Sequence, residues 1–502
     1  MNGTGTTHRE NRTVAELALR TLLPGFAGLS VPPEAEDALD EGLRGYALFG
    51  NNIRDRDQLG ELIADLRGAR PHALIGLDEE GGDITRLHYT TGATTPGNAA
   101  LGRVDDTELT REVYRGIGAE LRDIGVDVDF APVADVNTHH ANSIIGTRSF
   151  GSDPERVARH VAAAVTGLQD MGVAACVKHF PGHGATTQDS HHTLPTVDEP
   201  LDVLRQRDFG PFRAAVAAGT RMAMTGHIRM PALTGAQPAT FSDAAVTALL
   251  RREMGFGGVV VTDAVDMRAV GTAGPGEAVV RALAAGCDLV CLGAGRPGPG
   301  ALRSLIDDCT GAVVAAVAAG TLTRERLEEA NRHGDALQDW LRTPRGTAPR
   351  VRRGAGREAA RRALRTFGRT GPLDAPLVVQ LDSEANLAAG RVPWALAPYL
   401  AEVLPACEVL HVSDADAGDF PRERADGRDV VFVSRDTHRF PAVQRLIQDL
   451  AARTDVTLVE MGWSGGEDIQ GLSGRIHTFG AARVTAEAVA RLLADGVRED
   501  AR

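Results

Sequence analysis

The sequence predicts an α/β protein in which a (β/α)8 TIM-type barrel is followed by a smaller α/β sandwich domain. Short apolar runs alternate with longer Ala-, Leu- and Arg-rich stretches of helical period. Eight such alternations fill about the first 340 residues, and a TIM barrel is built from eight strand-helix units. After residue 342 the chain becomes rich in Arg, Gly and Pro, and a shorter series of alternations follows.

The eight strands of the predicted barrel are short apolar runs. In chain order we expect them near 21–29, 45–50, 73–78, 125–131, 173–178, 221–226, 257–262 and 286–292. The helices between and after them are expected at 34–44, 57–68, 107–124, 155–171, 201–218, 243–254, 275–285 and 299–319. Asp153-Pro154 and Ser242-Asp243 signal helix starts, because Ser and Asp cap a helix N-terminus and Pro fits its first turn.

The predicted domains are the catalytic barrel at 1–342, a linker with one short basic helix at 343–371, and the second domain at 372–502. Within the second domain we expect strands at 376–381, 407–412, 429–434, 455–460 and 475–479, and helices at 391–403, 440–453 and 484–494. We interpret the basic run of the linker as a solvated spacer rather than an anion-binding segment, because the chain as a whole is acidic.

Composition and charge exclude several classes of protein. Apolar residues make up 43% and charged residues 24%, which are ordinary globular values. The formal net charge of -13 argues against the basic face that nucleic-acid binding requires. The five Cys are scattered, which favours reduced thiols over a disulfide framework or a CxxC metal site. Without an apolar run of membrane length or an export signal, we expect a cytoplasmic protein with no nucleic-acid or membrane partner.

The segment richest in reactive side chains is 178–195, which reads KHFPGHGATTQDSHHTLP. Burying polar groups without partners costs about 2–7 kcal/mol each, so this composition predicts a loop rather than a buried helix face. The apolar run at 173–177 directly before it places the loop at the C-terminal end of the fifth strand. In a TIM barrel, that end of the strands carries the catalytic groups.

Charged and polar side chains also follow other predicted strands, so we expect them to converge on one mouth. They are Asp78 and Arg86 after the third strand, Asp135 and Arg148 after the fourth, Lys178 and His179 at the end of the fifth, His227 after the sixth and Asp263 after the seventh.

Together these motifs resemble the bacterial β-N-acetylglucosaminidases of glycoside hydrolase family 3. Residues 178–184 with Asp189-Ser190-His191 match the family's K-H-F-P-G-H-G segment and the D-S-H that follows it. Its D-x-E-G-G-x-x-x-R element corresponds to 78–86, its R-S-F element to 148–150, and the segment that delivers the nucleophile to 255–263. The resemblance covers about residues 20–340, and the two-domain layout is similar to that of the longer members.

Two positions depart from the family pattern. Many relatives carry Arg where this chain has Asp83, and Asp or Asn where it has Ala264. Neither departure removes a catalytic group. Both bear on the shape of the sugar pocket and therefore on substrate preference.

The resemblance implies a retaining exo-β-N-acetylglucosaminidase, a glycoside hydrolase that removes terminal β-linked N-acetylglucosamine by double displacement. Asp263 is implied as the nucleophile that forms the glycosyl intermediate. His191 is implied as the acid/base with Asp189 as its partner, because a nearby carboxylate raises the pKa of an imidazole from about 6.5 toward neutrality. No metal and no cofactor are implied.

The resemblance also implies which residues bind the terminal sugar. A carboxylate accepts hydrogen bonds from two adjacent hydroxyls, whereas Arg and Lys only donate. His183 is expected to shape the loop and His192 to be an exposed bystander, while His227 either lines the mouth or is a satisfied strand-end histidine. The implied sugar-binding residues are Asp78, Arg86, Arg148, Lys178 and His179.

Several alternatives stay open at the level of sequence. A β-N-acetylglucosaminide phosphorylase that releases N-acetylglucosamine 1-phosphate needs the same Asp and His. A metal-dependent barrel hydrolase could use His179, His183, Asp189 and His191 as ligands, although Pro181 and Gly182 argue against the helix that such spacing requires. A catalytically dead sugar-binding protein would not need all three catalytic residues. The choice between chitooligosaccharides and cell-wall fragments as substrate, the role of the second domain and the oligomeric state are also open.

Overall fold

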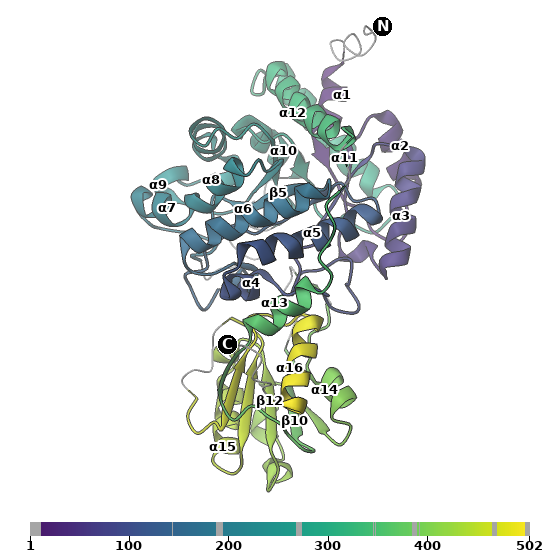
Figure 1. Cartoon of the computed structure of the whole chain (residues 1–502). Helices are drawn as coiled ribbons and strands as arrows, with labels where there is room; N and C mark the ends of the chain where they lie inside the picture. The colour runs from purple at the N-terminus through teal and green to yellow at the C-terminus, as the bar shows by residue number, and fades with distance from the viewer. Residues whose placement is uncertain are drawn as a thin grey trace.

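The computed structural model describes residues 12–142, 144–186, 194–267, 274–344, 346, 348–383, 389–390, 392–463 and 469–496. Figure 1 shows a larger part that contains α1 to α12 and a smaller part that contains the later strands and helices, joined by an extended segment and α13. Both parts combine helices with mostly parallel strands, as the sequence predicts. Within the described ranges, no helix has the length and apolar character needed to span a membrane.

The strands of the larger part close into a ring. Six parallel strands form one sheet, and β1 pairs with β8 in parallel. The N–H of Ala47 donates to the carbonyl of Pro24, and the N–H of Thr262 donates to the carbonyl of Leu289, which joins β1 to β2 and β7 to β8. The predicted TIM-type barrel is therefore confirmed. Its strands are β1 (Leu22–Leu23), β2 (Gly45–Ala47), β3 (Leu74–Leu77), β4 (Val128–Asp129), β5 (Ala174–Phe180), β6 (Met222–Thr225), β7 (Val259–Thr262) and β8 (Val290–Cys291).

Side chains alternate between the inside and the outside of this ring, as they must along a barrel strand. On β5, Ala174 and Cys176 point into the barrel, where they pack with Phe130, Met222 and other inward residues. Their neighbours Ala175 and Val177 face outward into the larger core beneath the helices. This alternation of side chains builds two apolar layers, one inside the ring and one outside it, and they hold the strand ends in place.

The helices cover the outside of the barrel (Figure 1). Those that the sequence predicts are α2 (Pro33–Glu41), α3 (Arg56–Ala69), α5 (Thr107–Asp123), α6 (Pro154–Asp170), α7 (Leu201–Arg207), α8 (Phe209–Ala217), the π-helical η4 (Ala244–Glu253), α10 (Pro275–Ala285) and α11 (Ala301–Ala318). The helix expected at 201–218 is broken at Asp208 into α7 and α8. Pro211 causes this break, because it has no N–H to offer the carbonyl of Arg207 and its ring crowds that turn.

In the described part of the barrel, four α-helices lie outside the predicted ranges: α1 (Val14–Leu19), α4 (Asn98–Val104), α9 (Pro231–Thr234) and α12 (Arg324–Arg342). α12 lies against the N-terminal ends of β1 and β2. Its Asp335 pairs with Arg20 at 2.6 Å and with the fully buried Arg44 at 2.9 Å. α12 thus covers the barrel end opposite to the one that carries the strand-end polar residues.

The smaller part is an α/β sandwich around a six-stranded sheet in the order β11-β10-β12-β13-β14-β9. Only β9 runs antiparallel to its neighbour. α15 (Pro441–Ala451) packs on one face, and α14 (Ala397–Val403) and α16 (Arg483–Asp495) pack on the other. The strands are β9 (Arg365–Gly368), β10 (Leu377–Leu381), β11 (Glu408–Val412), β12 (Val430–Ser434), β13 (Val456–Glu460) and β14 (Gly474–His477).

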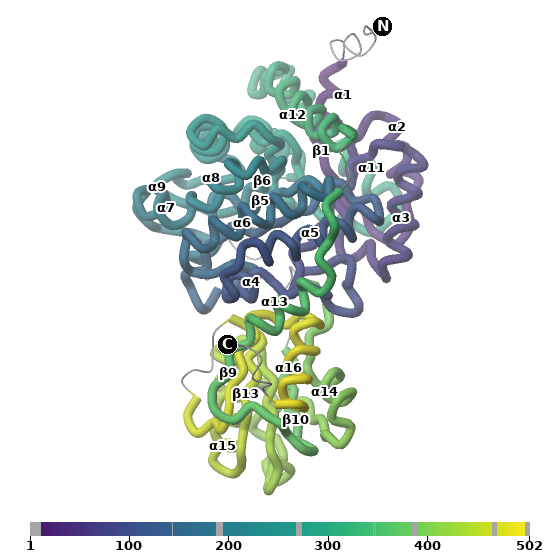
Figure 2. Tube along the Cα trace, in the orientation of Figure 1, coloured from purple at the N-terminus to yellow at the C-terminus, as the bar shows by residue number. Residues whose placement is uncertain are grey.

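The segment expected as a linker contributes to both parts. Figure 2 shows the chain leaving α12 and running along the barrel past α5 before it reaches α13. α13 (Ala355–Ala363) packs against α4 and α5 of the barrel and against α16 of the second domain. The sequence predicts the short helix but not β9, which joins the second sheet. The domain boundaries expected at 342 and 372 stay predictions.

Candidate active site

A cavity of about 250 Å³ opens at the C-terminal ends of the barrel strands. Asp263 and all five of the predicted sugar-binding residues line it. The cavity therefore brings together side chains that are up to about 185 positions apart in the chain. Apolar side chains complete the wall: Phe49, Ile84, Phe130, Ile144, Met224, Met267 and Cys291. The predicted acid/base His191 and its partner Asp189 lie outside the described residues, as does His192.

The loop after β3 supplies Asp78, Glu80 and Arg86, and a buried carboxylate shapes it. One oxygen of Glu79, Oε2, accepts hydrogen bonds from the Thr85 hydroxyl at 2.9 Å and from the N–H groups of Arg86 at 2.7 Å and Leu87 at 2.9 Å. These bonds curl the loop around the Glu79 side chain, so that Arg86 turns back toward the strand ends.

Glu80 is the centre of a buried ion-pair cluster. Its Oε1 lies 2.7 Å from the Nζ of Lys178 and 2.7 Å from Nη2 of Arg148. The Nζ of Lys178 also lies 2.6 Å from Oδ1 of Asp78. Burial alone would raise the pKa of the Glu80 carboxyl, but Arg148 and Lys178 hold this pKa well below its usual range. Glu80 therefore carries a full negative charge that orients the two cations.

His179 is held at both of its ring nitrogens. Its Nδ1 lies 2.7 Å from Oδ2 of Asp135, and Nη2 of Arg148 lies 3.3 Å from its Nε2. Burial alone would raise the pKa of Asp135, but His179 and His183 lower it. The ionised carboxylate accepts only, so Nδ1 carries the hydrogen and Nε2 accepts from the arginine.

His183 also lines the cavity, which the sequence analysis did not expect of it. Its backbone N–H donates to Oδ1 of Asp135 at 2.7 Å, and its Nδ1 lies 3.0 Å from the Thr186 hydroxyl. Burial lowers the pKa of His183 to about 4, so its ring is neutral near pH 7. Among the described residues, its buried Nε2 has no hydrogen-bond partner. His183 thus both shapes the loop and presents a ring nitrogen in the cavity wall.

Asp263 follows β7, and its neighbours fix its backbone. Its N–H donates to the Thr225 carbonyl at 2.9 Å, and its Oδ1 accepts from the N–H of Ala264 at 2.8 Å. The carbonyl of Ala264 in turn accepts from Nε2 of His227 at 3.0 Å. Nδ1 of His227 is bonded to Thr240, so His227 is a satisfied strand-end histidine outside the cavity wall.

Among the described residues, four acidic side chains line the cavity together with one Lys and two Arg. Besides the predicted Asp78 and Asp263, the acidic ones include Glu80 and Asp266. The sequence places Glu80 and Asp135 at strand ends but gives neither of them a role, and it does not single out Asp266. Asp266 also follows a predicted strand within a few residues, and that position is the signal that could have found it.

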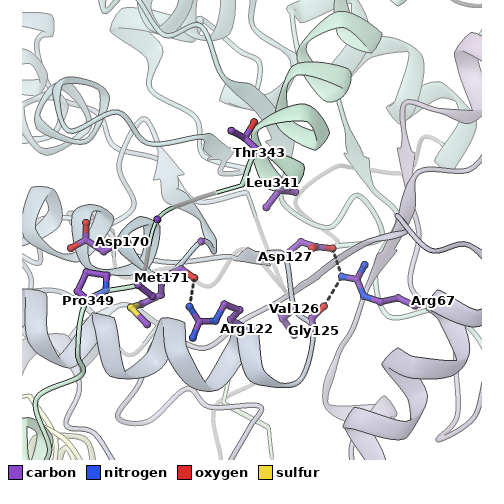
Figure 3. A pocket seen from close by; sticks show the side chains of 13 residues that line it. Arg67, Arg122, Gly125, Val126, Asp127, Asp170, Met171, Leu341, Thr343 and Pro349 are labelled. Atoms are coloured by element: carbon purple, nitrogen blue, oxygen red, sulfur yellow. Dashed lines mark hydrogen bonds and ion pairs between the residues drawn. The ribbon is translucent and has the colours of Figure 1, made fainter. Parts of the chain in front are cut away.

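A larger cavity, of about 540 Å³, lies at the other end of the barrel (Figure 3). Its wall includes residues just before β4 and β5 and part of the segment after α12. Its charged groups are paired: Arg67 lies 2.9 Å from Asp127, and Arg122 donates to the Met171 carbonyl at 3.4 Å. Because TIM-barrel chemistry occurs at the C-terminal ends of the strands, the smaller cavity is the candidate active site.

The comparisons with known proteins agree with this geometry. Residues 31–334 match the glycosyl hydrolase family 3 N terminal domain. The β-hexosaminidase of Stenotrophomonas maltophilia (strain K279a) is 35% identical over 340 residues, covering 64% of this chain and 98% of that relative. The β-hexosaminidase of Xylella fastidiosa (strain 9a5c) is 39% identical over 277 residues, covering 54% of this chain and 82% of that relative.

The similarity to solved structures extends over both parts of the chain. A glycoside hydrolase family 3 β-N-acetylglucosaminidase from Paenibacillus sp. str. FPU-7 has a TM-score of 0.87 and 29% sequence identity to this chain. The match covers 97% of this chain and 98% of that one. The fold, the strand-end cavity and the matched barrel thus agree: the chain belongs to glycoside hydrolase family 3 and is a glycoside hydrolase.

Proposed function

We propose that this enzyme is a retaining exo-β-N-acetylglucosaminidase that removes terminal β-linked N-acetylglucosamine from a small oligosaccharide. The observation that carries the proposal is that Asp263 shares one cavity with Asp78, Arg86, Arg148 and Lys178. A nucleophilic carboxylate beside a fixed set of hydroxyl-binding groups is the arrangement that retaining glycosidases require. The names of the relatives, β-hexosaminidase and β-N-acetylglucosaminidase, support the choice of sugar.

The size of the cavity supports removal of one terminal sugar at a time. Its volume of about 250 Å³ is below the roughly 300–1,000 Å³ of pockets that hold drug-sized ligands. A cavity of this size suits a single sugar ring, with the rest of the oligosaccharide outside it. Asp78 accepts hydrogen bonds from the ring hydroxyls, while Arg86, Arg148 and Lys178 donate to them.

The charges that line the cavity suit the transition state. Among the described residues that face the cavity, four are carboxylates and three are Lys or Arg, so apart from the histidines the carboxylates outnumber the cations by one. Glycoside cleavage passes through an oxocarbenium-like state with positive charge near the anomeric carbon. A fixed negative excess in a partly dry site stabilises that charge more than it stabilises the neutral substrate.

In the proposed first step, an Asp263 oxygen attacks the anomeric carbon and the bond to the leaving oxygen breaks. His191, assisted by Asp189, gives its proton to that oxygen. In the second step His191 takes a proton from water, whose oxygen attacks the anomeric carbon and releases Asp263 as carboxylate. Two inversions at one carbon give net retention of configuration.

The neutral His183 has a proposed role in substrate binding. Its Nε2 is buried in the cavity wall, and no described residue pairs with it. A buried ring nitrogen without a partner costs about 1–3 kcal/mol, and a polar group of the bound sugar would remove that cost.

We further propose that the enzyme works in the cytoplasm in carbohydrate metabolism, on chitooligosaccharides or cell-wall fragments. The five cysteines are free thiols and four of them are buried, which suits a reducing compartment.

Release of para-nitrophenol from its N-acetyl-β-glucosaminide tests the proposed sugar, with the β-glucoside measured in parallel. Turnover of the acetamido sugar and little turnover of the glucoside is the expected result. Activity on the glucoside alone would overturn the substrate but keep the mechanism. Mass analysis of products formed in phosphate buffer separates the free sugar, which hydrolysis gives, from a sugar 1-phosphate, which phosphorolysis would give.

A further inference from the structure

Asp83 connects the barrel to the second domain. Its Oδ2 accepts from Nη2 of Arg435 at 2.9 Å and from the Thr147 hydroxyl at 2.6 Å, and its Oδ1 accepts from the N–H of Ala481 at 2.8 Å. Arg435 follows β12 and Ala481 precedes α16, so two of these three donors belong to the second domain. The side chains of Asp83 and Arg435 are only 4% and 15% exposed, so water screens their attraction less than at an open surface.

Each barrel residue in this contact lies next to a residue of the cavity wall. Asp83 directly precedes Ile84, and Thr147 directly precedes Arg148. The loop that carries Asp83 is closely packed, because a Cβ at Gly82 would lie 2.4 Å from the Cα of Gly97. A displacement of Asp83 or Thr147 is therefore transmitted along the backbone to groups that face the substrate.

The second domain also reaches the cavity wall at another arginine. Nη1 of Arg86 donates to the carbonyl of Ala389 at 3.4 Å, from the segment after β10. The guanidinium of Arg86 lies over the ring of Tyr89, 5.8 Å from its centroid. A carbonyl from one domain and an aromatic ring from the other thus fix the direction of this guanidinium.

We propose that the second domain is a component of the sugar site, because it positions the cavity arginines. Arg435 is a positioning residue: through Asp83 and Thr147 it holds the short helix η2 (Gly146–Arg148), which carries Arg148. The carbonyl of Ala389 does the same for Arg86. This inference rests on the proposed binding of the sugar by these two arginines.

Asp83 faces the second domain instead of lining the cavity, and Arg435 supplies the opposite charge. Asp83 therefore anchors the loop after β3, and it acts on the pocket only through its neighbours.

The test measures KM and kcat separately in Arg435→Ala, Thr147→Val and Arg435→Lys. Sugar-hydroxyl contacts bind the ground state as well as the transition state, so misplaced arginines raise KM more than they lower kcat. We expect KM to rise about 10-fold in Arg435→Ala and in Thr147→Val, with kcat within about threefold of the wild type. Arg435→Lys keeps a hydrogen-bond donor and the positive charge, so we expect its KM to lie closer to that of the wild type than to that of Arg435→Ala.

Arg453→Ala is the matched control. It removes the same side chain from the same domain, but Arg453 pairs with Asp426 at 2.8 Å within that domain. We expect its KM to equal that of the wild type. Thermal unfolding of every variant shows whether a change in KM accompanies loss of fold.

Two results would overturn the proposal. One is an Arg435→Ala enzyme with a lower melting temperature and an unchanged KM, which would make the contact purely structural. The other is an equal rise of KM in Arg453→Ala. The comparison uses whichever aryl glycoside the wild type hydrolyses, so a wrong sugar would overturn the proposed function without deciding this test.

Discussion

Glu80 of the barrel and Glu460 of the second domain are both buried carboxyl groups at or just after the end of a parallel strand, yet their environments shift their pKa values in opposite directions. Glu80 lies 2.7 Å from both Lys178 and Arg148, and these cations hold its pKa below the usual range although burial opposes them. Burial and the nearby Asp436 raise the pKa of Glu460 to about 8.

The donors around Glu460 are neutral. They are the N–H groups of Asp436, Thr437 and Gly462 and the hydroxyl of Thr437. In the described part of the chain, no Lys or Arg forms an ion pair with it. Neutral hydrogen bonds thus fail to offset the desolvation of this carboxyl, whereas two buried cations do so for Glu80. The charged cluster around Glu80 therefore lies at the cavity, where the proposed chemistry uses it. Glu460, which is largely protonated near pH 7, instead stabilises the turn that follows Arg435.

Replacing Glu80 should have the largest effect. Glu80→Gln leaves Lys178 and Arg148 short of one negative charge in a buried cluster, and breaking such a cluster costs about 3–5 kcal/mol. We expect kcat/KM to fall at least about 100-fold and the melting temperature to drop by several degrees, because the cations that face the sugar lose their anchor. Steady-state kinetics and thermal unfolding measure both. An active Glu80→Gln enzyme would show that the cluster does not organise the site.

Replacing Glu460 should reduce stability without a comparable loss of activity. Glu460→Gln places an amide N–H₂ against groups that donate, which costs about 1–3 kcal/mol. A loss of kcat/KM as large as that of Glu80→Gln would erase the distinction between the two carboxyls.

The two carboxyls should also give opposite pH dependence of stability. The folded-state pKa of Glu460, about 8, lies above the ordinary value of 4.5, so its contribution is fully present below pH 4.5 and is lost as the pH rises toward 8. The slope is about 1.4 kcal/mol per pH unit within that window. The pKa of Glu80 is lowered, so its contribution is present above pH 4.5 and is lost as the pH falls. Urea unfolding of wild type and Glu460→Gln from pH 5 to pH 8 should show the first slope only in the wild type.

His183 should give a smaller effect. In His183→Gln the side-chain amide reaches the position that Nε2 of the histidine has in the wild type. In His183→Asn the shorter side chain places its amide nearer to the position of Nδ1. Because one hydrogen bond is worth about 0.5–1.5 kcal/mol, we expect a loss of about 3- to 10-fold in kcat/KM for Asn and a smaller loss for Gln. Equal losses in the two variants would assign His183 to loop shaping alone.

Chelation should have no effect. Among the described residues, no group of three or more His, Cys, Asp or Glu side chains is arranged to hold a metal ion, and the proposed mechanism needs none. Activity after dialysis against EDTA should equal that of the untreated enzyme. A loss that zinc restores would revive the metal-dependent alternative.

The barrel could be predicted because its signals are local. The strands are short apolar runs, five of which a charged or polar residue follows, and α3, α5 and α6 each begin at an Asp cap, as where Asp153 accepts from the N–H of Glu155. β9 was missed because the residues RTFG lack an apolar run and are mostly exposed. α12 was missed because polar and charged side chains dominate it and its partners Arg20 and Arg44 are about 300 positions away.

The candidate site could be predicted only in part. Strand-end positions and family motifs identified Asp78, Lys178 and Asp263, which share the cavity. The contact of Asp83 with Arg435 spans 352 positions and that with Ala481 spans 398, so no local sequence pattern predicts either contact. Thr186 bonds to Nδ1 of His183, which leaves Nε2 as the ring nitrogen without a described partner. Only the folded loop determines which of the two nitrogens Thr186 reaches.

The most direct test of the account is to trap the covalent intermediate on Asp263. A 5-fluoro derivative of N-acetylglucosaminyl fluoride suits this, because fluorine at C5 slows both steps by destabilising the oxocarbenium-like state, and fluoride leaves without an acid. Asp263 and Asp266 share the tryptic peptide that follows Arg252, so fragment-ion mass spectrometry must resolve them. We predict one sugar on Asp263, and a β-configured first product from the natural linkage. A sugar on Asp266, or an α-configured product, would contradict the assignment.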